Sequence, residues 1–259
     1  MINLFWRLQK QLKGRILLDC VDSINFYLRL IYFLAGLKLK KLTINLRNIE
    51  QLFDIVESFQ YKLFKKSRYT VTVMMHQKKE EFVEFIDLIK KSKPRTILEI
   101  GTSEGGTLFF FSKFAAPEAN IITIDLPIVR NYASYSPAKI PFFKLYKPKK
   151  QKIYFLRKDS HKTSTIRKIS KILKNYELDV LFIDGDHSYE GVKMDFENFS
   201  PFVRKNGLIA FHDIVEHPPE SNCEVSQFWN EIKQKHDYQE FISKPNDNWA
   251  GIGIIYKSF

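Results

Sequence analysis

The chain has 259 residues, of which 44% are hydrophobic and 27% are charged, so it can bury a full core and is not globally disordered. Lysine and arginine outnumber aspartate and glutamate by 41 to 29, giving a net charge of +12. The excess lies in residues 1–70 and 144–173, and the remainder is net acidic. Cys20 and Cys223 form neither a disulfide framework nor a zinc-ribbon spacing, which predicts a reducing compartment, the cytoplasm.

Residues 1–70 are predicted to form a helical, basic and amphipathic extension. The first 15 residues lack the apolar region and cleavage site of a signal peptide. The most apolar stretch, Ile24–Leu37, has 14 residues, fewer than the ~20 needed to cross a bilayer. We expect these helices to pack on the main domain or on a second subunit in a homo-oligomer. Contact of residues 1–40 with the inner face of a membrane stays open as an alternative.

Residues 71–259 alternate short apolar runs with amphipathic stretches, after a first helical pattern that ends at Pro94. This alternation predicts an α/β fold with a Rossmann-like, doubly wound, mostly parallel seven-stranded sheet. Two β-like runs without a helix between them predict a C-terminal antiparallel hairpin strand. Pro137–Gln151, with three prolines, is expected to be a loop and a candidate lid. The expected strands lie near residues 96–100, 120–125, 153–157, 179–183, 207–211, 238–242 and 251–256.

The segment LEIGTSEGGT places Gly101, Gly105 and Gly106 between a buried strand and a helix, where a ligand can approach backbone N–H groups. No lysine follows these glycines, which disfavours a nucleotide-hydrolysing P-loop. Asp125 ends the next strand 24 residues after Gly101, near the ~20-residue offset of a carboxylate that binds a ribose. The pattern favours adenosine binding. Tight strand-to-helix packing of the glycines and a capping role for Asp125 remain the simpler alternatives.

A second group of polar residues follows the last two predicted parallel strands. DVLFIDGDHSYEGV brings Asp184 and His187 to one strand end, and GLIAFHDI brings His212 and Asp213 to the neighbouring end. Carboxylates crowded at one edge repel each other unless a cation is bound, which favours Mg²⁺ or Mn²⁺ held by Asp184 and Asp213. The imidazole of His187 can act as a general base.

Simpler roles stay open for the polar residues around this group. Asp186 or His187 would then cap the helix that follows, and His212 would only be hydrogen-bonded. Glu216 and His217 lie close behind and could support the ligands of the site, but we expect them to be solvated.

These motifs, and above all FIDGDHSYEGVKMDFENFSPFVRKNGLIAFHDI, resemble the class I S-adenosylmethionine-dependent methyltransferases. The similarity covers about residues 70–258 and is greatest to the sugar and natural-product O-methyltransferase branch, which includes cephalosporin-hydroxylase-like and macrolide-sugar methyltransferase-like groups. It implies S-adenosyl-L-methionine as cofactor and a Rossmann-like methyltransferase domain over residues 71–259. The cofactor-binding residues that it implies are Glu99, Gly101, Thr102, Ser103, Gly105, Gly106, Asp125, Asp159, Ser160 and Asp184.

The resemblance also implies roles in catalysis and metal binding. His187 matches the base of the metal-dependent members, and Asp184 and Asp213 match their metal ligands. His212 stands where several relatives have an acidic ligand, so Asp184, His212 and Asp213 form the predicted metal site. With an imidazole in this set, a transition metal is favoured over Mg²⁺.

The predicted function is therefore O-methylation of a hydroxyl on a sugar, glycan or natural product, as in polysaccharide biosynthesis. RNA or another nucleic acid is the alternative acceptor, because residues 144–173 hold 11 basic residues and one acidic residue. Much of that charge falls on an amphipathic helix, which is typical of a solvated face and makes nucleic acid the less favoured partner. A non-catalytic cofactor-binding or scaffolding protein is the third alternative.

Overall fold

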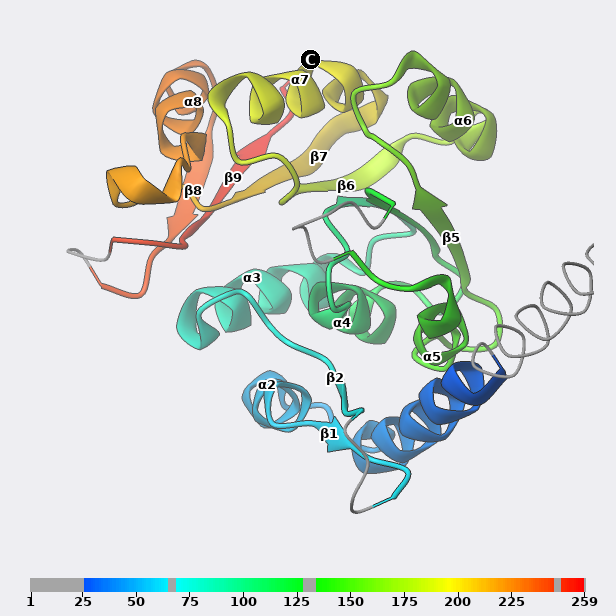
Figure 1. Ribbon diagram of the computed structural model, residues 1–259. Coiled ribbons are helices and arrows are strands. Elements are labelled where there is room, and N and C mark those ends of the chain that lie inside the picture. The colour runs from blue at the N-terminus through cyan, green and yellow to red at the C-terminus, as the bar shows by residue number, and fades with distance from the viewer. Residues whose placement is uncertain (1–25, 65–68, 128–133, 245–247, 259) are drawn as a thin grey trace, which may run out of the picture.

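The computed structural model describes residues 26–64, 69–127, 134–244 and 248–258. Within these ranges a seven-stranded sheet lies between two layers of helices (Figure 1). The order of its strands is β5-β4-β3-β6-β7-β9-β8, as a doubly wound α/β fold requires. The strands are β3 (Thr96–Ile100), β4 (Asn120–Asp125), β5 (Lys152–Arg157), β6 (Leu178–Ile183), β7 (Val203–His212), β8 (Tyr238–Phe241) and β9 (Ile252–Tyr256).

The sheet is mostly parallel, as predicted. β3 pairs in parallel with both β4 and β6, and β5 and β7 extend the parallel part on either side. β9 runs antiparallel to both β7 and β8, which confirms the predicted C-terminal hairpin. The central strands are buried along nearly their whole length, because helices cover both faces of the sheet.

The helices fall into two layers with separate cores. One layer holds α3 and α4, and the other holds α6, α7 and α8 (Figure 1). α3 illustrates why these segments are helical: acidic residues occupy its first turn, basic residues its last turn, and Lys93 ends it in a left-handed conformation before Pro94. The helices are α3 (Lys79–Ser92), α4 (Gly106–Phe114), α6 (Thr163–Leu173), α7 (Tyr189–Phe199) and α8 (Val225–Ile232), with short 3₁₀ turns η2 (Ser200–Phe202), η3 (Pro219–Ser221) and η4 (Lys233–Lys235).

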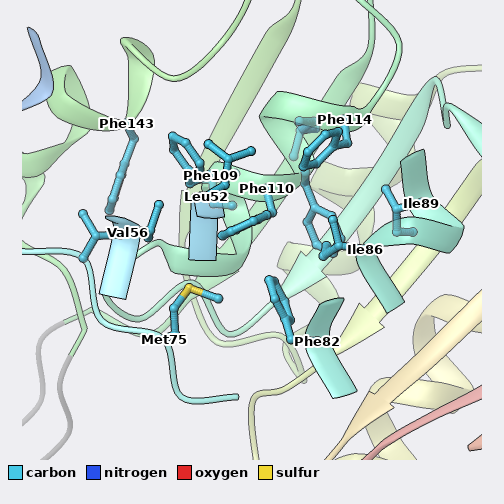
Figure 2. Close-up of a cluster of buried hydrophobic side chains, with 14 of the residues drawn as sticks. Leu52, Val56, Met75, Phe82, Ile86, Ile89, Phe109, Phe110, Phe114 and Phe143 are labelled. Atoms are coloured by element: carbon cyan, nitrogen blue, oxygen red, sulfur yellow. The ribbon is translucent and has the colours of Figure 1, made fainter. Parts of the chain in front are cut away.

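The N-terminal region shares a core with the α3–α4 layer. Residues 26–43 are helical, and they precede α2 (Ile49–Glu57) and a two-stranded sheet of β1 (Gln60–Tyr61) and β2 (Val71–Thr72). Leu52 and Val56 of α2 lie near Phe109 and Phe110 of α4 in the buried cluster of Figure 2. Lys113 Nζ donates to the carbonyl oxygen of Thr43 at 2.6 Å, which ties α4 to the end of the first helix.

The predicted extension is therefore helical over residues 26–43 and 49–57 and contains strand β1, while residues 1–25, with Cys20, lie outside the described residues. The domain boundary near residue 70 stays a prediction. Among the described helices, none combines the length and the apolarity needed to span a bilayer.

The segment Pro137–Gln151 is more ordered than the predicted loop. It contains η1 (Pro137–Lys139) and α5 (Ile140–Lys144), whose Phe142 and Phe143 are fully buried. The loop prediction was wrong over residues 137–144 because two of the prolines lie in the first turn of a helix, where a missing N–H group costs nothing.

Replacing Leu52 by alanine tests how far the N-terminal region stabilises the fold. Leu52 is fully buried, so Leu52→Ala should lower the free energy of unfolding by about 3 kcal/mol, measured by urea denaturation. The matched change Leu42→Ala removes the same atoms from a side chain that is 48% exposed and should cost less than about 0.5 kcal/mol. Equal stabilities of the two variants would contradict a shared core.

Candidate active site

The predicted site residues gather at the carboxyl edge of the sheet. β3, β4, β6 and β7 are adjacent and parallel, so the residues that follow them meet at this edge. Gly101 N donates to the carbonyl oxygen of Ile124 at 2.9 Å, and Asp184 N donates to that of Ile100 at 2.9 Å. The turn after β3 is thereby tied to the ends of both neighbouring strands.

Gly101 makes this turn possible. Its φ is +97°, in the region that favours glycine. A Cβ atom at this position would collide with the backbone carbonyl of Asp184. Strand packing alone therefore explains why this position is a glycine. The predicted approach of a ligand to the turn stays a prediction.

Gly105 and Gly106 also have packing reasons. A Cβ on Gly105 would enter the ring of Phe143 from α5, and one on Gly106 would collide with Met75 and with the backbone of Met74. Lys139, which is nearly buried, forms an ion pair with Glu104 in the same turn. Residues of α5, η1 and the N-terminal region thus pack against the turn after β3. A direct contact of Gly105 and Gly106 with a cofactor stays a prediction.

Glu99 of β3 is a fully buried carboxyl group beneath this turn. Thr123 Oγ1 donates to Glu99 Oε2 at 2.5 Å, and Thr102 Oγ1 contacts the Thr123 hydroxyl. Glu99 Oε1 has no hydrogen-bond partner among the described residues. Burial raises the pKa of Glu99 to about 8, with the charges of Asp184 and Asp125 acting in the same direction. An unpaired buried oxygen of this kind is a candidate contact for a polar ligand.

Asp125 ends β4 beside the glycine turn. Its Oδ2 accepts a hydrogen bond from Ser103 N at 2.8 Å, so the carboxylate holds the loop where Ser103 has a φ of +44°. Burial raises the pKa of Asp125, and the hydrogen bond from Ser103 opposes this shift. Asp159 and Ser160 follow β5, where Lys158 N donates to the carbonyl oxygen of Asp125 at 2.8 Å. The predicted ribose and adenine residues are therefore on neighbouring loops.

His212 lies between the two aspartates of the predicted metal site. Its Nδ1 is 3.3 Å from Asp184 Oδ1 and 3.2 Å from Asp213 Oδ1. One donor atom from each of these three residues lies within 4.8 Å of the other two. His212 is almost completely buried, with Nδ1 facing the two carboxylates and Nε2 without a hydrogen-bond partner among the described residues. An imidazole nitrogen between two carboxylates fits the position of a metal ligand.

The charges of this cluster depend on each other. Burial disfavours charge on Asp184 and Asp213, but the nearby positive charge of His212 outweighs it and lowers the pKa of both carboxyl groups. Burial also disfavours charge on His212, yet the two carboxylates raise its pKa well above the usual value. An imidazolium therefore neutralises part of the negative charge when no cation is present. His212 would have to lose this proton to bind a metal ion.

His187 contacts both aspartates from the turn after β6. Nε2 is 3.6 Å from Asp184 Oδ1, and Nδ1 is 3.6 Å from Asp213 Oδ2. The pKa of His187 is raised by its interaction with Asp184, against the effect of burial. Its side chain is 45% exposed, so it is the accessible imidazole of the cluster. A partly exposed imidazole between two carboxylates can accept a proton from an incoming hydroxyl.

Three further residues contact the site: Gln77 and Cys223, which the sequence did not predict there, and His217, which was expected to be solvated. Gln77 Nε2 donates to Asp184 Oδ2 at 3.0 Å, from the segment before α3. His217 Nε2 lies 3.3 Å from Asp213 Oδ1, and its side chain is only 11% exposed, so the expectation that His217 is solvated was wrong. Cys223 offers its sulfur within 4.8 Å of donor atoms of His187 and Asp213. No local sequence pattern predicts these contacts, because each contact joins residues that come together only in the fold.

Asp186 does not cap α7, contrary to the simpler alternative; it holds the residue that does. Its Oδ1 accepts hydrogen bonds from the backbone N–H and the hydroxyl of Ser188, at 3.0 and 2.8 Å. Ser188 in turn caps α7, since its hydroxyl oxygen accepts a hydrogen bond from Gly191 N. Asp186 therefore shapes the turn between β6 and α7.

The comparison with known families agrees with this architecture. Residues 98–214, from β3 to just beyond β7, match the family model described as a methyltransferase domain. The matched segment, a little under half of the chain, is therefore similar to a methyltransferase domain. The matched segment contains the predicted site residues of the turn after β3, those at the ends of β4 and β5, and the histidine–aspartate cluster.

Two curated relatives share part of the sequence. Protein y4gI of Sinorhizobium fredii is 28% identical over 153 residues, which are 56% of this chain and 16% of that protein. Protein R132 of Acanthamoeba polyphaga mimivirus is 32% identical over 122 residues, which are 47% of this chain and 52% of that protein. The match thus spans about half of one relative's length and about a sixth of the other's.

Two solved structures share the fold. The O-methyltransferase from Bacillus cereus, in complex with SAH, has a TM-score of 0.50 and covers 86% of this chain and 96% of its own. TomG from Streptomyces achromogenes, an O-methyltransferase involved in tomaymycin synthesis and in complex with SAM, has a TM-score of 0.51 and the same coverage. Both are 14% identical in sequence to this chain, so the likeness is one of fold.

A substitution in the turn after β3 tests whether position 101 requires a glycine. Gly101→Ala should lower the free energy of unfolding by at least about 2 kcal/mol, because it adds strain at positive φ and a collision with the Asp184 carbonyl. Ser103→Gly, at a φ of +44° two residues away, should stay within about 1 kcal/mol of the wild type. Thermal denaturation of both variants measures the difference, and a stable Gly101→Ala protein would show that the turn is not so constrained.

Proposed function

We propose that this protein is an S-adenosylmethionine-dependent O-methyltransferase that acts on a hydroxyl group of a sugar, glycan or natural product. The observation that carries the proposal is the convergence of two sets of residues at one edge of a methyltransferase fold. Glu99, Gly101 and Asp125 lie around the turn after β3, and Asp184 connects this turn to the histidine–aspartate cluster. A cofactor site and a proton-accepting site are thereby adjacent.

The residues around the glycine turn fit the cofactor. Glu99 Oε1 is buried without a partner, and it would accept a hydrogen bond from the amino group of the methionine portion. Asp125 would bind the ribose hydroxyls, and Asp159 and Ser160 would lie near the adenine. S-adenosylmethionine, when bound, supplies a methyl group on a positively charged sulfur that is strongly electrophilic. The protein's part is then to orient the acceptor and to remove its proton.

His187 would remove that proton. One ring nitrogen receives it while the other stays beside the carboxylate of Asp184 or Asp213, which stabilises the imidazolium that forms. His187 would hold the acceptor's proton while the oxygen, freed of it, takes up the methyl group that the cofactor would supply. Two flanking carboxylates and a partly exposed face make His187 better placed for this role than the buried His212.

Asp184, His212 and Asp213 fit a divalent cation. Donor atoms about 2.1 Å from one ion lie roughly 3.0 to 3.4 Å apart in octahedral or tetrahedral arrangements. The separations of 3.2 and 3.3 Å between His212 Nδ1 and the two carboxylates fall in that range. A cation held there would lower the pKa of an acceptor hydroxyl and help to position it.

Nucleic acid is the less favoured acceptor. The basic side chains of α6, including Lys168 and Lys171, are exposed, while Ile169 and Leu173 pack into the core. This arrangement supports the interpretation of a solvated helix face. We place the reaction in the cytoplasm, in the synthesis of a glycan or natural product.

Calorimetric titration with S-adenosylhomocysteine tests the cofactor site. The wild type should bind the compound, and Asp125→Ala should weaken binding at least about tenfold, because it removes the carboxylate that binds the ribose. Asp87→Ala, at an exposed position of α3, is the matched control and should leave affinity unchanged. Absence of binding to the wild type would remove the methyltransferase proposal.

His187→Ala separates catalysis from cofactor binding. Its affinity for S-adenosylhomocysteine should equal that of the wild type, while transfer of labelled methyl groups to an active glycan or natural-product acceptor should fall by about 10²- to 10⁴-fold. The acceptor screen also includes RNA, whose selective methylation would favour the alternative acceptor. Equal loss of cofactor binding in His187→Ala and Asp125→Ala would contradict the separate roles, and cofactor binding without methyl transfer to any acceptor would indicate a non-catalytic protein.

The mixed donor set predicts a preference among metals. Chelator-treated protein should bind Mn²⁺ more tightly than Mg²⁺, because an imidazole suits the softer ion better. His212→Ala should weaken Mn²⁺ binding at least about tenfold, whereas His236→Ala, after η4 and outside the cluster, should not. Electron paramagnetic resonance of free Mn²⁺ measures the Mn²⁺ affinity of each protein, and competition by Mg²⁺ in the same experiment compares the two metals. Tighter binding of Mg²⁺, or an unchanged Mn²⁺ affinity in His212→Ala, would contradict the proposed ligand role.

A further inference from the structure

The helix formed by residues 26–43 has two apolar faces. One face packs into the protein: Ile31, Ala35 and Leu39 are fully buried, and Gly36 lies against Phe142 and Leu145. The opposite face carries Phe26, Leu30, Phe33 and Leu37, which are 71%, 38%, 43% and 43% exposed. Their spacing of four, three and four residues places them in one stripe along the helix.

This exposed stripe is more than scattered surface hydrophobicity. Its four large side chains are contiguous on a helix at the edge of the molecule, beside α5 (Figure 1). Contiguous apolar patches on a soluble surface usually mark contact with a protein partner or a membrane. The charges around the stripe decide between these two occupants.

Cations border the stripe on both sides. At 100° per residue, Arg29 and Lys40 project to one side of it and Lys41 to the other, and all three are exposed. No acidic residue occurs in the sequence between Asp22 and Glu50. A second copy of the chain packed symmetrically on this face would bring cations toward cations, with no carboxylate on the helix to pair with them. Anionic headgroups would pair with these cations while the stripe enters the acyl boundary.

We propose that this helix face binds the surface of an anionic lipid bilayer, with Phe26, Leu30, Phe33 and Leu37 inserted and Arg29, Lys40 and Lys41 at the headgroups. This is the geometry of an interfacial amphipathic helix, here with its other face fixed in the protein core. The assignment does not depend on methyl transfer, because none of these residues belongs to the candidate active site. It would hold the sheet and its active-site edge at a membrane without a spanning segment.

Sedimentation of the full chain with vesicles tests the assignment. The protein should sediment with vesicles that contain phosphatidylglycerol and much less with pure phosphatidylcholine, and added salt should weaken the binding. Phe33→Glu should reduce partitioning at least about tenfold, since it replaces a large inserted side chain with a repelled charge. Leu37→Glu, on the same stripe, gives an independent second variant.

The matched control is Tyr176→Glu, an aromatic side chain that is 67% exposed beyond α6. It introduces the same charge and should bind vesicles as the wild type does, and circular dichroism verifies that all variants are folded. The proposal would be overturned if the wild-type protein did not bind anionic vesicles, or if the Phe33→Glu and Leu37→Glu variants bound them as the wild type does. Analytical ultracentrifugation without lipid supplies the competing outcome: a dimer that Phe33→Glu dissociates would assign the stripe to a second copy instead.

Discussion

The arrangement of the site depends on one close backbone contact, between the turn after β3 and the end of β6. Gly101 has no side chain where the carbonyl of Asp184 lies, and Asp184 N donates to the carbonyl oxygen of Ile100. Any Cβ at Gly101 would force these strand ends apart. Because Glu99 precedes the contact on one strand and Asp184 begins the histidine–aspartate cluster on the other, the contact fixes the position of Glu99 relative to that cluster.

A second constraint acts at the end of β7. Asp213 has a φ of +61°, an uncommon conformation for a residue other than glycine. It persists because the backbone on both sides is fixed: His212 pairs with Ile252 in the sheet, and Val215 N donates to the carbonyl oxygen of Ala250 at 3.0 Å. Strain of this kind, of the order of 1 kcal/mol, is tolerated where the surrounding structure outweighs it. Here it coincides with the residue that contacts three histidines.

The sequence predicts those parts of the molecule whose signals are local. Hydrophobic periodicity located the strands of the main sheet and the major helices, and the parallel order placed Asp184 and Asp213 at one edge. Contacts that form only in the fold left no such signal, so Gln77 was missed and His217 was expected to be solvated. The helical segment at Pro137–Lys144 was mistaken for a loop. Proline is ambiguous in sequence, because it breaks the interior of a helix and yet suits its first turn.

The carboxyl groups at this edge avoid mutual repulsion in three different ways. Burial raises the pKa of Glu99 to about 8, which disfavours a charge on this carboxyl group as long as Oε1 has no partner. The carboxylate of Asp125 is stabilised by the backbone N–H of Ser103. Asp184 and Asp213 are instead compensated by His212, a side chain that can release its proton. The charge of this last pair is thus compensated by a side chain that can lose its proton, whereas the carboxyl groups around the turn after β3 are accommodated by burial and by a backbone N–H group.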